Sequence, residues 1–227
     1  SSTVSANTTS GFSIVKYTGT GANATVGHGL GVAPKMIHVK GIDVGTTNWL
    51  TGGSNISSNW GSSLHLNTTG AIDTYNYWQN QAPNANTFAL STDGANNQSG
   101  INFIAYCFAE KTGYSKFGSL TGNGSTDGTF VYCGFAPAFV MVKAITSGNW
   151  FMYDNKRPGY NNVQQFLEAD GNAAEYTSNA NHSIDILSNG FKFTGGSGSN
   201  TSGRECIFMA FASAPLVGSN NVPCTAR

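Results

Sequence analysis

Apolar residues occur in short runs that are rich in β-branched and aromatic side chains and end at glycine, asparagine or proline. In the segment 35–40, Met36 and His38 alternate with Ile37 and Val39, which places the two pairs on opposite faces of one strand. The pattern predicts strands near residues 12–18, 35–41, 48–52, 62–67, 86–91, 101–110, 114–120, 129–133, 138–145, 149–154, 163–168, 183–187, 190–194 and 204–213. Both faces of 101–109 and 204–213 are apolar, so these strands are expected to be buried on both sides.

Helical periodicity is almost absent. The best candidate is 162–169, where Val163, Phe166 and Leu167 fall at helical spacing, and the same residues are equally readable as a strand. Turn signals are frequent: Asp93-Gly94, Asp127-Gly128, Asp170-Gly171 and Asn189-Gly190. Many short strands separated by such turns predict an all-β sandwich or barrel.

The chain also repeats itself. The first copy contains Gly11-Phe12-Ser13, Thr18-Gly19-Thr20-Gly21, Ala33-Pro34, Val39-Lys40 and Asn48-Trp49. The second contains Gly113-Tyr114-Ser115, Thr121-Gly122-Asn123-Gly124, Ala136-Pro137, Val142-Lys143 and Asn149-Trp150, at an offset of 102 or 103 residues that falls to 101 at the last pair. A period of this length predicts a duplicated domain rather than a solenoid.

Only two or three residues separate the copies at Glu110 to Gly113, too few for a flexible linker. We therefore predict two homologous β-sandwich-like halves, of jelly-roll or lectin-like type, rigidly docked or fused into one pseudo-twofold unit. The expected division is an N-terminal linker or arm at 1–10, a first β repeat at 11–111, a second β repeat at 112–215 and a C-terminal tail at 216–227. The start without an initiator methionine or signal-peptide pattern leads us to expect a piece of a longer protein or a processed product.

Composition narrows the function classes. Charged residues make up 10% of the chain, against roughly 25% in an ordinary domain, and the formal net charge is zero. No basic stripe is present for nucleic acid, and no apolar run approaches the roughly 20 residues of a spanning helix. Aromatic residues at 12% provide material for a core. A surface dominated by Ser, Thr, Asn and Gly is common on extracellular β-proteins and virion proteins.

The cysteines Cys107, Cys133, Cys206 and Cys224 form no CxxC pair, so a zinc site is not expected. Three of them sit in apolar strand-like runs and are predicted to be free buried thiols. A Cys107–Cys206 bridge is the alternative, although the repeat pairs Cys107 with Ala210 and Cys206 with Phe103.

Catalytic patterns are not recognisable. The glycine-rich loop Gly27–Gly31 surrounds His28 but is not followed by a G-x-S-x-G elbow, and the second repeat replaces His28 by Val131 or a near neighbour. The histidines lack metal-ligand spacing, and the calcium-loop pattern is missing. The acidic residues that could form a glycosidase pair are interpreted as scattered surface carboxylates: Asp43, Asp73, Glu168, Asp170 and Glu175. We predict no enzyme activity, no cofactor and no metal.

The aromatic residues are the candidate binding residues. Tyr75-Asn76-Tyr77-Trp78 combines flat rings with amide side chains, which suits sugars, and Trp60 lies in a similar polar segment. An interface anchor or a core position is the alternative for this group. Trp49 and Trp150 recur at equivalent places and are predicted to be core residues.

Several of these motifs resemble a repeated domain of tailed bacteriophages, especially marine ones. In the first half they are Gly11-Phe12-Ser13, Tyr17-Thr18-Gly19-Thr20-Gly21, Val26–Gly31 and Ala33–Ile37. In the second half they are Tyr106–Glu110, Gly113–Gly118, Thr121–Gly128, Phe135–Val140, Ser188–Lys192 and Thr225-Ala226-Arg227. Proteins with this domain are usually described as virion structural or tail-fibre-like, or only as a domain of unknown function, and the resemblance implies no active site.

The resemblance implies a structural protein on the surface of the phage particle. The expected role is a tail-fibre or appendage component that contacts the host, with a host surface glycan as a partner. A capsid decoration or cement protein that stabilises the head is the first alternative, and a polysaccharide depolymerase is the second. Other virion proteins are the expected partners, and a homo-oligomer, as a trimer or ring, follows from virion symmetry.

Overall fold

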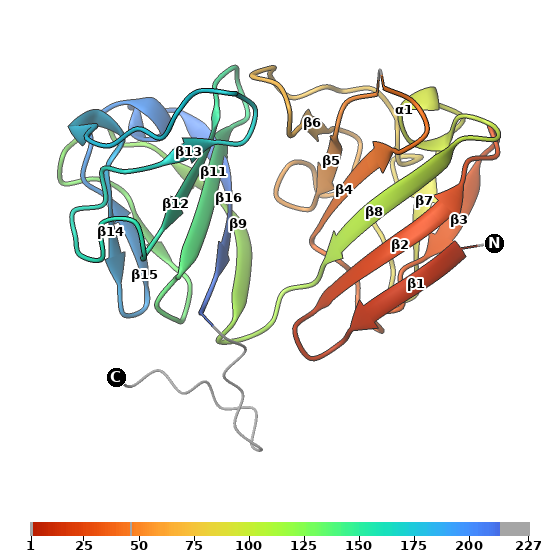
Figure 1. The fold of residues 1–227 in the computed structure, drawn as a ribbon, viewed down its shortest axis with the longest axis horizontal. Helices are drawn as coiled ribbons and strands as arrows, with labels where there is room; N and C mark the ends of the chain where they lie inside the picture. Colours follow the sequence, from red (N-terminus) through yellow and green to blue (C-terminus); the bar gives the residue numbers. More distant parts are fainter. Residues whose placement is uncertain (1, 46, 214–227) are drawn as a thin grey trace. The chain divides into compact units, whose positions relative to one another are not determined.

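The computed structural model describes residues 2–45 and 47–213 and confirms the all-β fold class (Figure 1). The chain divides into two compact units, Ser1–Glu110 (unit 1) and Lys111–Arg227 (unit 2). Each unit contains a large antiparallel sheet, a small second sheet and its own apolar core. No helix of the described residues is long and apolar enough to cross a membrane.

In unit 1 the large sheet has six strands. Their order is β1 (Ser2–Asn7), β2 (Phe12–Thr18), β8 (Asn102–Phe108), β4 (Met36–Gly41), β5 (Leu50–Gly53) and β6 (Leu64–His65). The small sheet pairs β3 (Ala24–Gly27) with β7 (Thr87–Leu90), followed by the short helix α1 (Gly94–Asn97). Side chains such as Val15 and Phe103 from the large sheet pack with Phe88 from the small one, so the core lies between the two sheets.

In unit 2 the large sheet has five described strands. Their order is β13 (Leu167–Glu168), β12 (Trp150–Asp154), β11 (Phe139–Ala144), β16 (Glu205–Phe211) and β9 (Ser115–Thr121). The small sheet has the order β10 (Phe130–Tyr132), β15 (Gly190–Phe193) and β14 (Ile184–Leu187), and two 3₁₀ turns span Ala180–His182 and Gly198–Asn200. Phe191 of the small sheet and Phe208 of the large sheet share the core.

The registers of the two large sheets correspond at an offset of 103 residues. Ser13 pairs with Cys107 between β2 and β8, and Lys116 pairs with Ala210 between β9 and β16. Met36 pairs with Phe108, and likewise Phe139 pairs with Phe211. The repeated sequence is therefore matched by a repeated pairing scheme.

The repeated Thr-Gly-x-Gly motif wraps a buried asparagine in unit 1. The Asn97 side chain accepts from the Thr20 backbone N at 2.8 Å and donates to the backbone oxygens of Ala22 and Ser91. A Cβ on Gly19 would lie 2.2 Å from the Gln98 backbone oxygen, and Gly21 has φ +70°. Gly19 is therefore required by the close approach of the loop to the backbone of Asn97 and Gln98, and Gly21 by its left-handed backbone conformation.

Unit 2 repeats this arrangement around Asn200. Its Nδ2 donates to the backbone oxygens of Ser125 and Gly195 at 2.8 and 2.9 Å, and its Oδ1 accepts from the Asn123 backbone N at 3.2 Å. A Cβ on Gly122 would lie 2.4 Å from the Thr201 backbone oxygen. In each unit, the repeated Thr-Gly-x-Gly motif thus forms a loop that is hydrogen-bonded to a buried asparagine.

The prediction of a linker or arm at 1–10 is wrong for Ser2–Asn7. These residues form β1, which pairs antiparallel with β2 from Ser2↔Tyr17 to Asn7↔Phe12. All six side chains of β1 are exposed at the edge of the sheet. Burial therefore imposes no apolar alternation on this strand, and its composition resembles that of a loop. The predicted C-terminal tail at 216–227 lies outside the described residues.

Other differences from the predicted strands also follow from local packing. The predicted helix alternative at 162–169 is wrong, because Val163 and Phe166 form isolated bridges with Ile184 and Tyr176 and only Leu167–Glu168 is a strand. The strand β3 is not predicted. In β8, buried residues alternate with half-buried ones, so the prediction of two buried faces is wrong there, whereas five consecutive residues of β16 are buried.

The described cysteines Cys107, Cys133 and Cys206 are free and buried, as predicted, and no Cys107–Cys206 bridge is formed. Burial raises the pKa of the Cys107 thiol to about 12 and that of Cys206 to about 11, which keeps both thiols protonated at neutral pH. Cys224 lies outside the described residues.

The buried His38 makes stability depend on pH. Burial lowers its pKa from 6.5 to about 4, with Nδ1 2.7 Å from the Thr51 hydroxyl. Between these two values the unfolded chain binds the proton and the folded chain does not, so the free energy of unfolding falls as the pH falls from 6.5 to 4, by about 3 kcal/mol. Met141 occupies the corresponding position of β11, so His38→Met is the matched variant.

Urea denaturation of both proteins at pH 7 and pH 4 measures this effect. The loss of stability on acidification is expected to be smaller in His38→Met by that amount, since the remaining titratable groups are common to both proteins. Equal losses of unfolding free energy in the two proteins would contradict the assignment of this pH dependence to His38.

Candidate functional site

The structure places three of the four predicted binding residues in the core of unit 1. Trp60 and Trp78 are 1% and 0% exposed, and Tyr77 is also buried. The two indoles meet edge to face at 5.3 Å, and Trp78 Nε1 donates to the Ser63 hydroxyl at 2.8 Å. The burial of these rings favours the core alternative for Trp60, Tyr77 and Trp78.

The repeated tryptophans differ from each other. Trp150 is buried, as predicted. Trp49 is only half-buried and stacks on Tyr106 with a centroid distance of 5.8 Å, so its predicted core position is wrong. Equivalent sequence positions thus have different surroundings in the two units.

Tyr75 remains an exposed candidate. The residue is 57% exposed, and the centroid of its ring lies 5.1 Å from that of the Tyr77 ring. The Asp73 carboxylate accepts from the Tyr75 backbone N at 2.8 Å and from the Tyr77 hydroxyl at 2.7 Å, and it lies 3.7 Å from His65 Nε2. Burial raises the pKa of Asp73, but these hydrogen bonds and His65 outweigh it and hold the pKa below its usual value. We call His65, Asp73, Tyr75 and Tyr77 the Tyr75 cluster.

The glycine-rich loop around His28 is structural. His28 is fully buried, with Nε2 3.1 Å from the Asn84 carbonyl and Nδ1 accepting from the Leu30 backbone N at 3.3 Å. Burial lowers its pKa, so the ring is neutral at pH 7. The His28 backbone N–H donates to the Asn86 carbonyl, and the Cys133 backbone N–H donates to the Asn189 carbonyl. Cys133 is therefore the counterpart of His28 in unit 2.

The acidic residues do not converge on a common site. Asp43 accepts from Asn102, Asp170 accepts from the Trp150 backbone N, and Glu175 pairs with Arg157. Among residues 2–45 and 47–213, no group of three or more His, Cys, Asp or Glu side chains could hold a metal ion.

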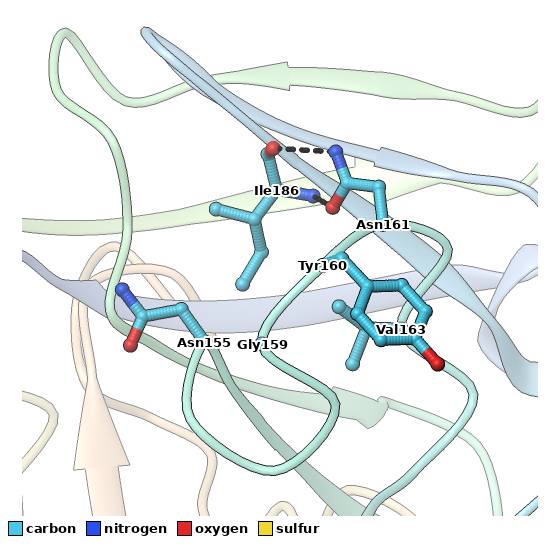
Figure 2. Close-up of a pocket in the computed structure, with 6 residues that line it drawn as sticks. All are labelled: Asn155, Gly159, Tyr160, Asn161, Val163 and Ile186. Atoms are coloured by element: carbon cyan, nitrogen blue, oxygen red, sulfur yellow. Dashed lines mark hydrogen bonds between the residues drawn. The ribbon is translucent and has the colours of Figure 1, made fainter.

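A cavity of about 230 Å³ opens on the surface of unit 2. It is lined by Asn155, Gly159, Tyr160, Asn161, Val163 and Ile186, and we call it the loop pocket (Figure 2). Val163 belongs to the buried core and Ile186 packs against it, so the floor is apolar. Tyr160, at the rim, is 77% exposed. None of the lining residues carries a charge.

The loop that forms the pocket is fixed at both ends. At its start, Asp154 accepts from the backbone N of Lys156 and Arg157, while the Arg157 guanidinium pairs with Asp154 at 2.6 Å and with Glu175 at 2.7 Å. Burial raises the pKa of Asp154, but these bonds outweigh it and lower the pKa. The Arg157 guanidinium is therefore paired with two carboxylates at the start of the loop.

At the other end of the loop, the side-chain amide of Asn161 bonds to both backbone groups of Ile186, as a neighbouring strand does in a sheet. Its Nδ2 donates to the Ile186 carbonyl and its Oδ1 accepts from the Ile186 backbone N, both at 2.9 Å (Figure 2). Val163 then forms an isolated bridge with Ile184. The loop is therefore held to β14 by hydrogen bonds of the Asn161 side chain and of the Val163 backbone.

The corresponding place in unit 1 is filled. The isolated bridges Ser63↔Asp73 and Phe166↔Tyr176 correspond at an offset of 103 residues. Trp60 and Val163 each precede the first bridge residue by three positions. A tryptophan packed on Trp78 in unit 1 is therefore replaced by a valine at the floor of a cavity in unit 2.

Sequence reasoning missed the loop pocket. The segment Gly159-Tyr160-Asn161-Asn162 has the same combination of an aromatic ring with amides that singled out Tyr75–Trp78. Applied to this segment, that criterion would have found Tyr160. It does not distinguish an exposed ring from a buried one, because both occur in polar surroundings along the chain.

A family model described as Domain of unknown function (DUF7483) matches residues 1–215. No curated protein and no solved structure matches the chain.

Proposed function

The chain belongs to the DUF7483 family, whose function is unknown, and we propose that it is a non-enzymatic surface component of a bacteriophage particle, a tail fibre or appendage that binds a host glycan. The loop pocket carries this proposal. It combines an apolar floor, an exposed tyrosine ring and amide side chains, without a charged lining residue. Sugar C–H faces stack on such rings, and sugar hydroxyls pair with amides.

Two further observations support a virion protein. The sequence resembles a repeated domain of tailed phages over most of residues 11–215. The surface is rich in uncharged polar residues, and the repeated motifs, such as the glycines around Asn97 and Asn200, serve the scaffold. The described carboxylates discussed above hold the fold together, which favours binding over the depolymerase alternative.

Labelling of the particle tests the location. Antibodies against the chain, detected as immunogold on intact phage, are expected on the tail or its appendages. Labelling of the head would overturn the appendage proposal in favour of a capsid decoration protein. Release of fragments when the purified protein is incubated with host polysaccharide would overturn the non-enzymatic assignment.

Tyr160→Ala is expected to weaken binding of the protein to host surface polysaccharide by about tenfold or more, because truncating an aromatic anchor typically costs over 1 kcal/mol. Biolayer interferometry on immobilised polysaccharide measures the affinity. Tyr132→Ala is the matched control, since Tyr132 is 64% exposed on β10 and does not line the pocket. A parallel Tyr75→Ala variant reports on the Tyr75 cluster. Unchanged affinity in Tyr160→Ala would remove the pocket from the proposal.

A further inference from the structure

We propose that the loop pocket binds the acetamido group of a neutral N-acetylated hexosamine. This inference rests on the proposed function and names the ligand class of the same site. An acetamido group combines a methyl group, an N–H donor and a carbonyl acceptor within a few ångströms. The pocket offers an apolar floor for the methyl group, an amide for the N–H and an aromatic ring for the sugar ring.

The floor matches the methyl group. Val163 is 2% exposed and the Ile186 side chain is partly buried against the same core, so both present hydrocarbon to the cavity. In Figure 2 the Ile186 side chain extends between Asn155 on one side and Tyr160 with Val163 on the other. Hydroxyl groups of an unmodified hexose would gain nothing from this floor and would lose hydration there.

Asn155 matches the N–H donor. Its Oδ1 is buried and has no hydrogen-bond partner among the described residues. The amide of Asn161 is by contrast already used on both sides by the Ile186 backbone. Buried polar atoms normally have a partner, so Asn155 is the lining amide that is not used within the described fold, and its Oδ1 accepts from a ligand once the amide turns toward the cavity.

Tyr160 matches the sugar ring. The tyrosine is 77% exposed and lines the pocket, so a ring held by its acetamido group at the floor lies beside an aromatic face. The volume of about 230 Å³ is below the range of roughly 300–1,000 Å³ typical of sites for drug-sized ligands, which limits the pocket to one sugar residue. The uncharged lining favours a neutral sugar over an acidic one.

Saturation-transfer-difference NMR on the full chain tests the inference. The probes are millimolar N-acetylglucosamine and N-acetylgalactosamine, with glucose and galactose as references. The acetyl methyl resonance is expected to receive the strongest saturation. The N-acetylated sugars are expected to bind about tenfold or more tightly than the references, as one additional apolar group in a fitted pocket contributes this much discrimination.

Two variants locate the binding. Val163→Trp introduces the residue that unit 1 has at this place and is expected to fill the floor and abolish the methyl signal. Tyr160→Ala removes the aromatic ring from the rim and is expected to weaken binding. Tyr132→Ala is expected to leave the affinity unchanged. Should Val163→Trp fail to fold, Tyr160→Ala and the comparison of the four sugars decide.

Equal binding of glucose and N-acetylglucosamine, or full binding by a folded Val163→Trp, would overturn this inference. Both results are compatible with a glycan-binding appendage. N-acetylhexosamine binding that is lost in Val163→Trp, together with immunogold on the head, would support the pocket and overturn the appendage role, so the two proposals fail separately.

Discussion

Asn97→Ala is expected to lower the free energy of unfolding by about 3 kcal/mol, because it removes three hydrogen bonds between a buried amide and the backbone, each contributing about 1 kcal/mol. The side chain accepts from the Thr20 N–H and donates to the carbonyls of Ala22 and Ser91. Asn97 and Ser91 are both buried, so water does not replace the bond to the Ser91 carbonyl in the folded state. Urea denaturation followed by circular dichroism measures the change.

The neighbouring Asn96 is the matched control. It is equally buried, but its side chain donates one bond, to the Tyr77 carbonyl at 3.0 Å, and its Oδ1 has no partner among the described residues. Asn96→Ala is therefore expected to cost about 1 kcal/mol. Equal losses of unfolding free energy in the two variants would show that burial of the amide determines its contribution to stability. The hydrogen bonds from Asn97 to the Thr-Gly-x-Gly loop would then have no measurable effect.

Trp78→Ala is expected to destabilise the protein by about 3–5 kcal/mol, the range for removing a large aromatic side chain from a core. The indole is fully buried, packs edge to face on Trp60 and bonds to Ser63. A Cβ on Gly52 would lie 2.6 Å from Trp60 and 2.7 Å from Trp78, which shows how closely the neighbouring strand approaches both rings. Thermal and urea unfolding measure the loss.

Trp49→Ala provides the comparison. Trp49 is half-buried and stacks on Tyr106, so its removal is expected to cost about 1 kcal/mol. A larger loss of unfolding free energy in Trp49→Ala than in Trp78→Ala would contradict the structure. It would instead agree with the sequence-based prediction that Trp49 is a core residue and Trp78 a binding residue.

The sequence predicts the strands well where burial imposes a pattern and poorly where it does not. The runs around Met36 and Phe208 are recognisable because alternate or consecutive side chains enter a core. The exposed edge strand β1 lacks such a pattern. The repeat offset of 102 or 103 residues in the sequence agrees with the offset of 103 residues between the strand registers of the two units.

The candidate site was less predictable, because exposure of an aromatic ring depends on residues distant along the chain. Trp78 is buried through Ser63 and Trp60, while Tyr160 is exposed in a loop held by Arg157 and Asn161. Both tyrosine and tryptophan occur among glycine and asparagine in either case. Only the tertiary structure separates the two outcomes.

The shared register has a consequence for folding. Because β8 and β16 pair in the same way with their neighbours, each strand could enter the other's sheet, a hazard of misassembly in repeat proteins. The side chains discriminate between them. Phe208 lies opposite Gly118, where a Cβ would be 2.7 Å from its ring, whereas Ala105 lies opposite Val15. An exchanged strand would set phenylalanine against valine in one sheet and alanine against glycine in the other. The nascent chain thus carries complementary side-chain volumes that disfavour exchange of β8 and β16.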